Sequence, residues 1–250
     1  MSSINKRILY KKLPLLERFQ WDSKVRLGRN ADGGYIIADE LKYDLLLSGG
    51  IGGDTSFEKN FLQRYPDVKK AYGFDGTVAD MSSKSYDNLF LVGKNIGTDS
   101  SNNETDLVEY IGDCKDIFLK MDIEGAEFDW ILNSAIDFNK FKQMVIEFHP
   151  FGSSDQDFGS WFVFMESLKK LNKTHKIIHI HANNIAGVLK FECENHGMIT
   201  LPRVCELTFV RSDQFDEHTI QKDTRPIPQE VDIRNFGHIP EISLSNFPWK

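Results

Sequence analysis

The chain has 250 residues, of which 40% are hydrophobic and 27% charged, a composition that predicts a globular domain with a sizeable core rather than a disordered chain. Its net charge of −7 comes without a basic stripe, so nucleic acids and anionic membrane surfaces are not expected as partners. The three cysteines, Cys114, Cys193 and Cys205, have the spacing of neither a disulfide framework nor a zinc site. With no signal peptide or membrane-spanning run in the sequence, they predict a cytoplasmic protein.

Residues 1–25 predict a short amphipathic helix that is broken near Pro14 and covers one side of the core. Short, strongly apolar runs follow, and such runs are typical of strands buried on both faces of a parallel sheet. They are Asp44–Ser48, Lys70–Asp75, Leu89–Val92, Ile117–Asp122, Met144–Phe148, Lys176–His181 and Glu206–Arg211. Apolar residues at helical spacing predict helices over Phe57–Tyr65 and Trp161–Leu171.

Strands that alternate with helices predict a Rossmann-like α/β fold, with a mostly parallel central sheet and helices on both faces. We expect its catalytic core to span residues 26–211. Residues 212–250 are polar and contain four prolines, which predicts an irregular C-terminal arm that wraps the domain. The whole chain, residues 1–250, is therefore expected to be a single domain.

The strongest local signal is a glycine-rich turn, Ser48–Asp54, between the first predicted strand and a helix. Glycines allow a sharp turn and let a ligand approach the main chain. Such a crevice beyond the strand ends is where α/β sheets bind nucleotides. Asp75 ends the next strand about twenty residues later, at the position of a ribose-binding acid. At the start of the helix, Thr55 and Glu58 have the spacing of a capping box.

The turn favours a cationic ligand over a dinucleotide. Thr55 replaces the third glycine of the dinucleotide fingerprint, and the loop carries Asp54 but no Lys or Arg for a pyrophosphate. S-Adenosylmethionine has a sulfonium and an ammonium group, so it is the expected cofactor, and NAD is the alternative. The residues expected to bind this cofactor are Ser48, Gly49, Gly50, Gly52, Asp54, Ser56, Asp75, Gly76, Arg29 and Asn30.

Acidic residues and histidines follow the later predicted strands. Asp122 and Glu124 come at the end of the fourth strand, and Glu147 and His149 at the end of the fifth. Because parallel strands end at one edge of a sheet, these residues are expected to surround one cleft. A base or a divalent metal there would activate a hydroxyl for methyl transfer. We predict His149 as the general base and Asp122 and Glu124 as further catalytic residues; candidate metal ligands are Asp122, His149 and His181.

Several segments share a motif pattern with one known family. They are Gly28–Tyr35 (GRNADGGY), Ser48–Glu58 (SGGIGGDTSFE), Tyr72–Asp75 (YGFD), Leu119–Glu127 (LKMDIEGAE), Ile146–His149 (IEFH), His181–Asn184 (HANN) and Glu206–Phe209 (ELTF). In this order they resemble the FkbM-type methyltransferases, from about Arg26 to the C-terminal arm, and LKMDIEGAE is the most specific of them. Gly49 stands where an aromatic residue is commoner in the family, which predicts a wider space near the methionine part of the donor.

The resemblance implies a class I methyltransferase fold, S-adenosylmethionine as the donor, and usually O-methylation. Family members act on sugars and on natural-product hydroxyls. We therefore expect an O-methyltransferase that acts on a hydroxyl of a sugar or glycan, with a natural product or a protein as the alternative acceptors. An NAD-dependent oxidoreductase and a non-catalytic protein that binds S-adenosylmethionine are the alternative functions. The sequence does not indicate the methylated position, the metal dependence or the oligomeric state.

Overall fold

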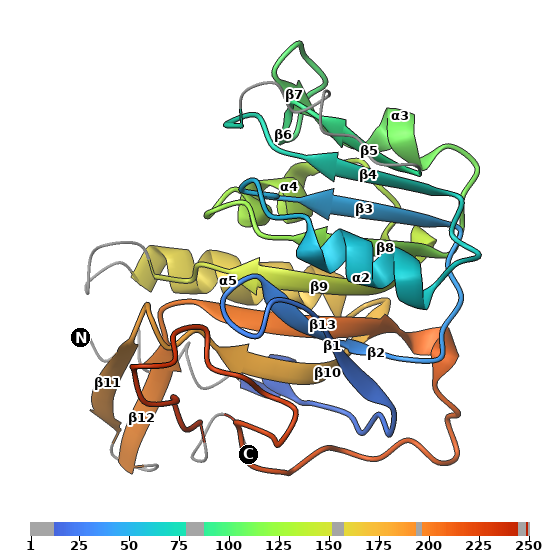
Figure 1. The fold of residues 1–250 in the computed structure, drawn as a ribbon. Coiled ribbons are helices and arrows are strands. Elements are labelled where there is room, and N and C mark those ends of the chain that lie inside the picture. Colours follow the sequence, from blue (N-terminus) through green and yellow to red (C-terminus); the bar gives the residue numbers. More distant parts are fainter. Residues whose placement is uncertain (1–12, 79–87, 152–157, 194–196, 245–248, 250) are drawn as a thin grey trace.

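The computed structural model describes residues 13–78, 88–151, 158–193, 197–244 and 249 (Figure 1). Its central element is a seven-stranded sheet. The strands are β3 (Leu45–Gly49), β4 (Lys70–Phe74), β5 (Leu89–Val92), β8 (Ile117–Met121), β9 (Phe141–Phe148), β10 (His175–Ala182) and β13 (Cys205–Arg211). The strands predicted from the apolar runs are thus all present, with small shifts at their ends.

The strand order in this sheet is β10–β13–β9–β8–β3–β4–β5. β13 pairs antiparallel with both of its neighbours, whereas the pairs from β9 to β5 are parallel. The chain moves outward from β3 to β5 and then crosses to β8 on the other side of β3, as in a Rossmann-like fold. Gly49 is aligned with Phe74 and with Met121. The segments that follow β3, β4 and β8 therefore leave the sheet at one edge, where the order reverses and ligands bind in such folds.

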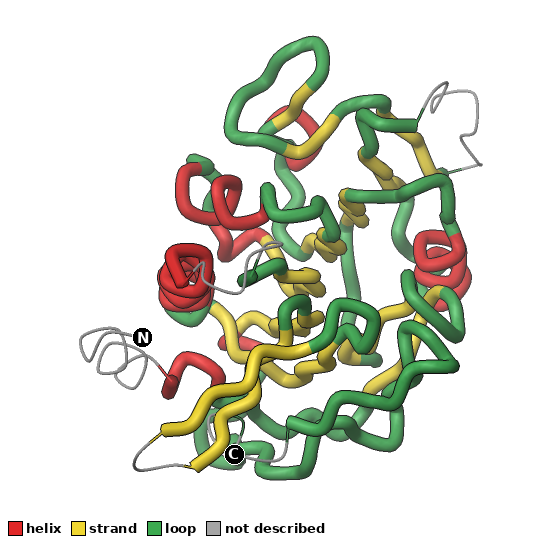
Figure 2. Tube along the Cα trace, turned by 90° about the vertical axis from the view of Figure 1, so that its left-hand side faces the viewer, coloured by secondary structure: helices red, strands yellow, loops and turns green. Residues whose placement is uncertain are grey.

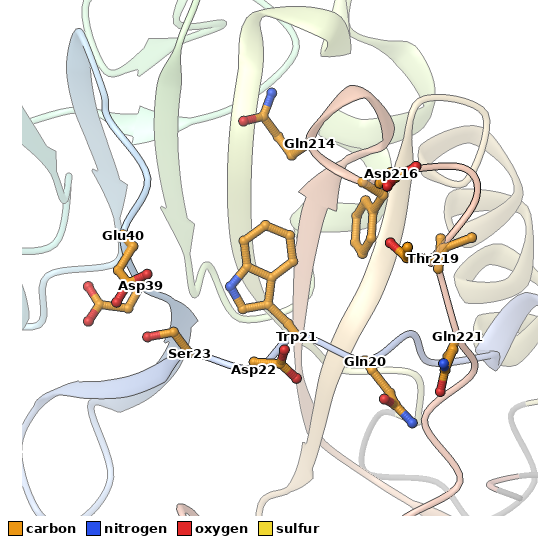
Figure 3. Close-up of a pocket in the computed structure, with 12 residues that line it drawn as sticks. Gln20, Trp21, Asp22, Ser23, Asp39, Glu40, Gln214, Asp216, Thr219 and Gln221 are labelled. Carbon is orange, nitrogen blue, oxygen red and sulfur yellow. The ribbon is translucent and has the colours of Figure 1, made fainter.

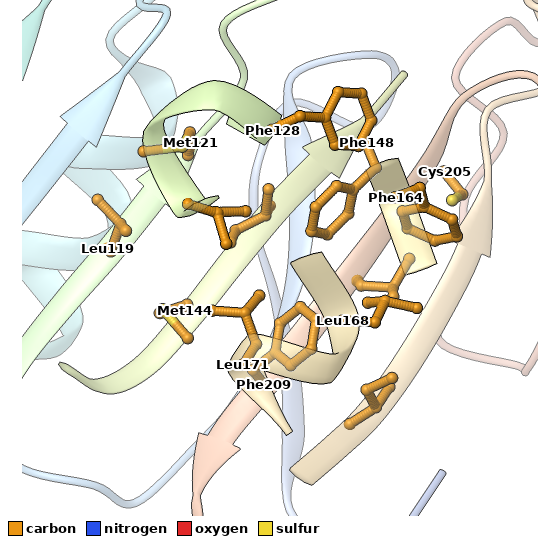
Figure 4. Packing of buried hydrophobic residues seen from close by; sticks show 14 of the residues in the cluster. Leu119, Met121, Phe128, Met144, Phe148, Phe164, Leu168, Leu171, Cys205 and Phe209 are labelled. Atoms are coloured by element: carbon orange, nitrogen blue, oxygen red, sulfur yellow. The ribbon is translucent and has the colours of Figure 1, made fainter. Parts of the chain in front are cut away.

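One face of the sheet is covered by α4 (Glu127–Asn133) and α5 (Phe158–Leu171) (Figures 1 and 2). The apolar stripe of α5 is buried, as its helical spacing predicts: Trp161, Phe164, Met165, Leu168 and Leu171. Figure 4 shows Phe164 beside Phe148 of β9, and their ring centroids are 5.1 Å apart. Burial of these large side chains on one side of the sheet is the main source of stability in this layer.

The other face is covered by α2 (Ser56–Arg64) and by an antiparallel pair of strands, β1 (Lys24–Gly28) and β2 (Gly34–Ala38) (Figure 1). Phe57 and Phe61 of α2 pack on Phe118 of β8, with centroid distances of 5.9 and 4.6 Å. Helices therefore cover both faces, as predicted. On this face, however, a β-hairpin shares the cover with the helix.

The start of α2 corrects the predicted capping box. Thr55 is the N-cap residue, but its side chain makes no capping hydrogen bond within the described residues. Asp54 accepts the hydrogen bond from the main-chain N of Ser56 at 2.9 Å instead. Glu58 lies on the buried face of the helix and accepts a hydrogen bond from the Ser48 hydroxyl. Its carboxyl group thus turns towards the sheet because the helix packs with this face inward.

The predicted N-terminal helix is wrong where the structure describes the chain, and residues 1–12 lie outside the described part. From residue 13 onward there is one 3-10 turn, η1 (Leu13–Leu16), and then an extended segment. Phe19 N donates a hydrogen bond to Ile177 O of β10 at 2.7 Å. Since β10 is an edge strand, this segment covers main-chain groups that would otherwise be open to pairing.

Smaller elements lie outside the central sheet: β6 (Asn95–Ile96), β7 (Glu104–Thr105), α3 (Val108–Ile111), η3 (Phe138–Lys140), β11 (Val188–Cys193), β12 (Gly197–Pro202) and η4 (Ser212–Gln214). β11 and β12 form an antiparallel hairpin. Among the described residues, no helix has both the length and the apolar character needed to cross a membrane.

The C-terminal segment, described for residues 212–244 and 249, is irregular apart from η4, as predicted. Buried polar side chains attach it to the sheet. Asn184 donates to the carbonyl oxygens of Phe236 and Ile239, both at 2.9 Å, and accepts from Phe236 N at 2.9 Å. Asn235 donates to Glu206 at 2.8 Å. The HANN segment therefore holds the C-terminal segment in place.

Candidate active site

A cavity of about 460 Å³ lies beyond the carboxyl ends of β3, β4 and β8. Its volume is in the range of small-molecule and cofactor sites, about 300–1,000 Å³. The cavity joins the glycine loop to acids at two strand ends. It is lined by Gly50, Gly52, Phe74, Asp75, Thr77, Asn95, Ile96, Glu104, Asp122, Ile123, Glu124 and Ala126.

The glycine loop presents its main chain to this cavity. Gly50 has φ +73°, and a Cβ there would lie 1.6 Å from the carbonyl oxygen of Asp122, so only glycine fits. Gly52 has φ +56°, and a Cβ there would meet no atom of the described residues within 4 Å. The first glycine therefore permits close packing of the loop on β8, and the second borders open space that a ligand can occupy.

Asp75 fastens the glycine loop to the end of β4. Its Oδ2 accepts a hydrogen bond from Gly52 N at 2.8 Å, and its Oδ1 accepts from Thr77 N and from the Thr77 hydroxyl at 2.8 and 2.6 Å. Burial disfavours the charged carboxylate, but the hydrogen bonds from Thr77 and Gly52 outweigh it and lower the pKa of Asp75. Asp75 is thus held as an anion at the cavity wall.

Gly49 does not widen the donor cavity, so that prediction is wrong. A Cβ at Gly49 would lie 2.4 Å from Ile96 Cδ1 and 3.2 Å from Ile123 Cγ2. These two side chains occupy the space that an aromatic residue at this position would take. Ser48, also predicted to bind the cofactor, is completely buried and bonded to Glu58, so its side chain is a structural contact.

A smaller cavity, of about 190 Å³, adjoins the first and shares Gly50, Gly52 and Asp122 with it. Arg29 and Asp54 line this cavity and face each other, with Arg29 Nε 3.7 Å from Asp54 Oδ2. Their side chains are 60% and 39% exposed, so both are accessible to a ligand. Three more residues predicted to bind the cofactor lie outside the described linings of both cavities, namely Asn30, Ser56 and Gly76.

The structure brings the polar residues of the fourth and fifth predicted strands together. One ligand atom from each of Asp122, Glu124 and His149 lies within 4.8 Å of the others. His149 Nε2 is 3.4 Å from Glu124 Oε2 and 3.8 Å from Glu147 Oε1. Glu124 has φ +55°, an uncommon conformation for a residue other than glycine, and this turn directs the chain into α4.

Glu127 is a site residue that was not predicted. It is completely buried at the start of α4, and its Oε1 accepts from His149 N at 2.8 Å and lies 3.1 Å from His149 Nδ1. Its Oε2 accepts from Gly125 N at 2.7 Å. Burial disfavours the charged imidazole, but the hydrogen bond and the charge of Glu127 outweigh it and raise the pKa of His149. The last residue of LKMDIEGAE therefore orients His149.

Only one of the two carboxylate oxygens of Asp122 has a hydrogen-bond partner among the described residues. Its Oδ2 accepts a hydrogen bond from the Tyr35 hydroxyl at 3.0 Å, while its Oδ1 is buried and has no hydrogen-bond partner among the described residues. The nearby ammonium group of Lys120 is bound to the carbonyl oxygens of Gly49 and Gly50, at 3.1 and 2.7 Å. Burial raises the pKa of Asp122 despite the positive charge of Lys120.

His181, the third candidate metal ligand, is not part of this cluster. The group of potential ligands found among the described residues consists of Asp122, Glu124 and His149. His181 is buried, and its two ring nitrogens lie 3.4 Å from Glu206 and 3.1 Å from Glu241. Its prediction as a metal ligand is therefore not supported, because these carboxylates tie the side chain to β13 and the C-terminal segment.

A further hollow, of about 510 Å³, lies at the opposite edge of the sheet, where β13 ends and the neighbouring β10 begins. Figure 3 shows Trp21 in its middle, between Asp39 and Glu40 on one side and Asp216 and Thr219 on the other. The Asp39 carboxylate is already paired with Arg64. This hollow is separate from the glycine loop and is not part of the candidate active site.

A comparison with known protein families gives one match, and it covers most of the candidate site. Residues 54–174 match the family model described as the methyltransferase FkbM domain. No curated protein matches the chain significantly.

Two solved methyltransferase structures align with part of the chain. A precorrin-6y C5,15-methyltransferase from Geobacter metallireducens has 11% identity and a TM-score of 0.35, over 69% of this chain and 82% of that one. A provisionally assigned rRNA methylase from Clostridium thermocellum has 12% identity and a TM-score of 0.35, over 68% of this chain and 88% of that one. At such scores neither structure adds to what the sheet order and the family match establish.

The region that matches the family model contains most of the site. It begins at Asp54 in the glycine loop and includes Asp75, the LKMDIEGAE segment and His149. These residues meet at the edge of a Rossmann-like sheet, beside a cavity of cofactor size. Residues 54–174 of this chain thus have the sequence character of the methyltransferase FkbM domain.

Proposed function

We propose that this protein is an S-adenosylmethionine-dependent O-methyltransferase whose acceptor is a hydroxyl group of a sugar or glycan. The observation that carries the proposal is a single cavity lined by two kinds of group. Asp75 and the glycine loop line it together with the acidic residues Asp122 and Glu124. A donor bound along the loop would therefore have acidic groups beside its reactive part.

The donor would be held by three sets of contacts. Asp75, kept as an anion, would accept hydrogen bonds from the ribose hydroxyls. The main chain at Gly50 and Gly52 would allow close approach of the nucleoside and the sulfonium. Arg29 and Asp54, in the adjoining cavity, have the charges that suit the carboxylate and the ammonium group of the methionine part.

The reaction would be an in-line displacement at the donor methyl group. The bond between the acceptor oxygen and the methyl carbon forms as the carbon–sulfur bond breaks, and the electron pair stays on sulfur to give S-adenosylhomocysteine. The hydroxyl proton has to leave, because a neutral hydroxyl is a weak nucleophile. We assign its removal to the cluster of Asp122, Glu124 and His149, of which Asp122 and Glu124 line the cavity.

A hydroxyl-rich acceptor suits the groups beside this cluster. Asn183 lies 3.4 Å from Glu147 and 3.4 Å from Asp32, so amide and carboxyl groups continue from the cluster towards the surface. Both kinds of group accept hydrogen bonds from hydroxyls, and the carboxylates repel phosphate. The net charge of −7 argues against a nucleic acid in the same way. A natural-product or protein hydroxyl is the alternative acceptor.

Donor binding is the first test. We expect S-adenosylhomocysteine, but not NAD, to bind in calorimetric titrations, and Asp75→Ala to abolish binding, since the substitution removes the ribose acceptor and the bond to Gly52. Asp216→Asn, at the opposite edge of the sheet, should bind as the wild type does. Circular dichroism would show whether Asp75→Ala remains folded. Binding of NAD alone would support the oxidoreductase instead.

Turnover is the second test, because a non-catalytic donor-binding protein would pass the first. The protein would be incubated with S-adenosylmethionine and a panel of glycosides, natural products and peptides, and the products analysed by mass spectrometry. We expect methylated glycosides. Donor binding without methylation of any acceptor class would favour the non-catalytic alternative, and methylated peptides would identify a protein acceptor.

A further inference from the structure

Three side chains with metal-binding atoms converge where Asp122 and Glu124 line the cavity. Potential ligand atoms of Asp122, Glu124 and His149 lie within 4.8 Å of one another. Ligands of one divalent ion, each at about 2.0–2.2 Å from it, are separated by about 3–4.4 Å. The Glu124 side chain is 86% exposed, so it has the freedom to move closer to the other two ligands.

Asp122 presents an oxygen that lacks a partner. Its Oδ1 is buried without a hydrogen bond among the described residues, whereas Tyr35 holds Oδ2 at 3.0 Å. Buried polar atoms are normally satisfied, and one left unsatisfied in a native structure points to a group that binds there. A cation coordinated by Oδ1 would satisfy it, while Tyr35 fixes the orientation of the carboxylate.

His149 has the outer contact that is usual for a metal-binding histidine. Such histidines almost always donate the second ring N–H to a carboxylate, a carbonyl oxygen or water. Glu127 Oε1 lies 3.1 Å from His149 Nδ1 and is completely buried. The contact leaves Nε2, the nitrogen that faces Glu124 and Glu147, free to bind an ion.

Negative charge is concentrated at this site and only partly compensated by Lys120 and His149. The carboxyl groups of Glu124, Glu127 and Glu147 surround the His149 ring at 3.1–3.8 Å. The ammonium group of Lys120 is bound to main-chain carbonyl oxygens rather than to any of these carboxyl groups. Partly buried carboxylates are costly without a cation, and a divalent ion is the strongest compensation a protein site can recruit.

We infer that Asp122, Glu124 and His149 form a site for a divalent cation, with Glu127 and Tyr35 as positioning residues. Two carboxylates and one imidazole suit a cation such as Mn²⁺. Three protein ligands leave coordination positions open, and two neighbouring hydroxyl groups of a sugar would fill them. The role in methyl transfer rests on the proposed function, whereas cation binding itself does not.

The inference changes the role of His149. As a ligand through Nε2, it is no longer the free general base that the sequence predicted. A divalent cation lowers the pKa of an oxygen bound to it, so it would promote loss of the hydroxyl proton in place of the base. An acceptor with two adjacent hydroxyls would then be methylated in preference to one with an isolated hydroxyl.

The test is a titration of the chelator-treated, dialysed protein with Mn²⁺, followed by the electron paramagnetic resonance signal of the free ion. We expect saturable binding of one Mn²⁺ per chain. Asp122→Asn and His149→Ala should each lower the affinity at least about 10-fold, and Glu127→Gln should lower it about 10- to 100-fold. Asp216→Asn, in the acidic hollow at the opposite edge, should leave it unchanged.

Titration of each variant with S-adenosylhomocysteine serves as the folding control and separates the two proposals. Absence of Mn²⁺ binding by a wild-type protein that binds S-adenosylhomocysteine would overturn the cation site alone, and would return His149 to the role of general base. Mn²⁺ binding unchanged by Asp122→Asn and His149→Ala would overturn it too, as adventitious binding. Mn²⁺ binding as expected in a protein that binds no S-adenosylhomocysteine would support the site and contradict the proposed donor.

Discussion

At the scale of single residues, Gly49 and Gly50 are neighbours whose surroundings differ. A Cβ at Gly49 would meet the ends of the Ile96 and Ile123 side chains, which can move. A Cβ at Gly50 would meet the main-chain carbonyl group of Asp122 at 1.6 Å, and the φ of +73° is itself unfavourable for other residues. The sequence identified both as loop glycines, but it did not show that a larger residue would be tolerated at Gly49 and not at Gly50.

We therefore expect Gly50→Ala to destabilise the protein by at least about 3 kcal/mol and to abolish donor binding, because the loop has to move away from β8. Gly49→Ala should cost about 1 kcal/mol, since only flexible side-chain ends have to shift. Urea unfolding and titration with S-adenosylhomocysteine would measure both effects. Equal stability of the two variants would contradict the close approach of the loop to Asp122.

At the scale of the secondary-structure elements, α2 shows why local signals are only partly reliable. The sequence placed its start correctly at Thr55, but the capping contact comes from Asp54. Glu58, the expected partner in the cap, is on the buried face and bonds to Ser48 of β3. The sheet that a helix packs on decides which face of the helix is buried. Here that face includes Glu58, so its side chain points to the sheet and not to the helix start.

The two residues at this helix start offer a matched pair of substitutions. Asp54→Ala should lower the free energy of unfolding by about 1 kcal/mol, because the main-chain N of Ser56 loses its acceptor. Thr55→Ala should change it by less than about 0.5 kcal/mol, because its side chain makes no capping bond within the described residues. Denaturant midpoints would separate them, and a larger loss for Thr55→Ala would restore the capping box.

At the scale of the whole molecule, buried histidines connect the sheet to the C-terminal segment. His181 lies between Glu206 of β13 and Glu241. Burial disfavours its charge, but the charge of Glu206 and the hydrogen bonds with both carboxylates outweigh burial and raise the pKa of His181 to about 10. His175 is the contrasting case: it bonds to Phe141 O, and burial lowers its pKa to about 4.

Because the pKa of His181 is higher in the folded chain than the ordinary 6.5, its stabilising contribution is complete below pH 6.5 and is lost as the pH rises towards 10. We expect thermal unfolding to show this loss in the wild type and a flatter profile in His181→Gln. Hydrogen exchange should also report earlier opening near residues 235–241 at high pH. His175→Gln, which changes a histidine that is neutral throughout this range, should keep the wild-type slope.

The sequence by itself determined the strands, the glycine loop, the acid at Asp75 and the polar residues that follow β8 and β9. These follow from local rules, since apolar runs make buried strands and the ends of parallel strands share one edge. It also determined that the C-terminal segment is irregular. Such features depend on residues that are close in the sequence, so they can be predicted from the sequence alone.

Only the tertiary structure decided the direction of β13, the hairpin cover over one face, and the partners of the buried polar groups. Glu127 meets His149, Tyr35 meets Asp122, and His181 meets Glu241 across 22, 87 and 60 positions of the chain. No local pattern specifies such pairs. A buried polar group has to find a partner wherever the packed chain brings one, so the environment of the candidate site is a property of the fold.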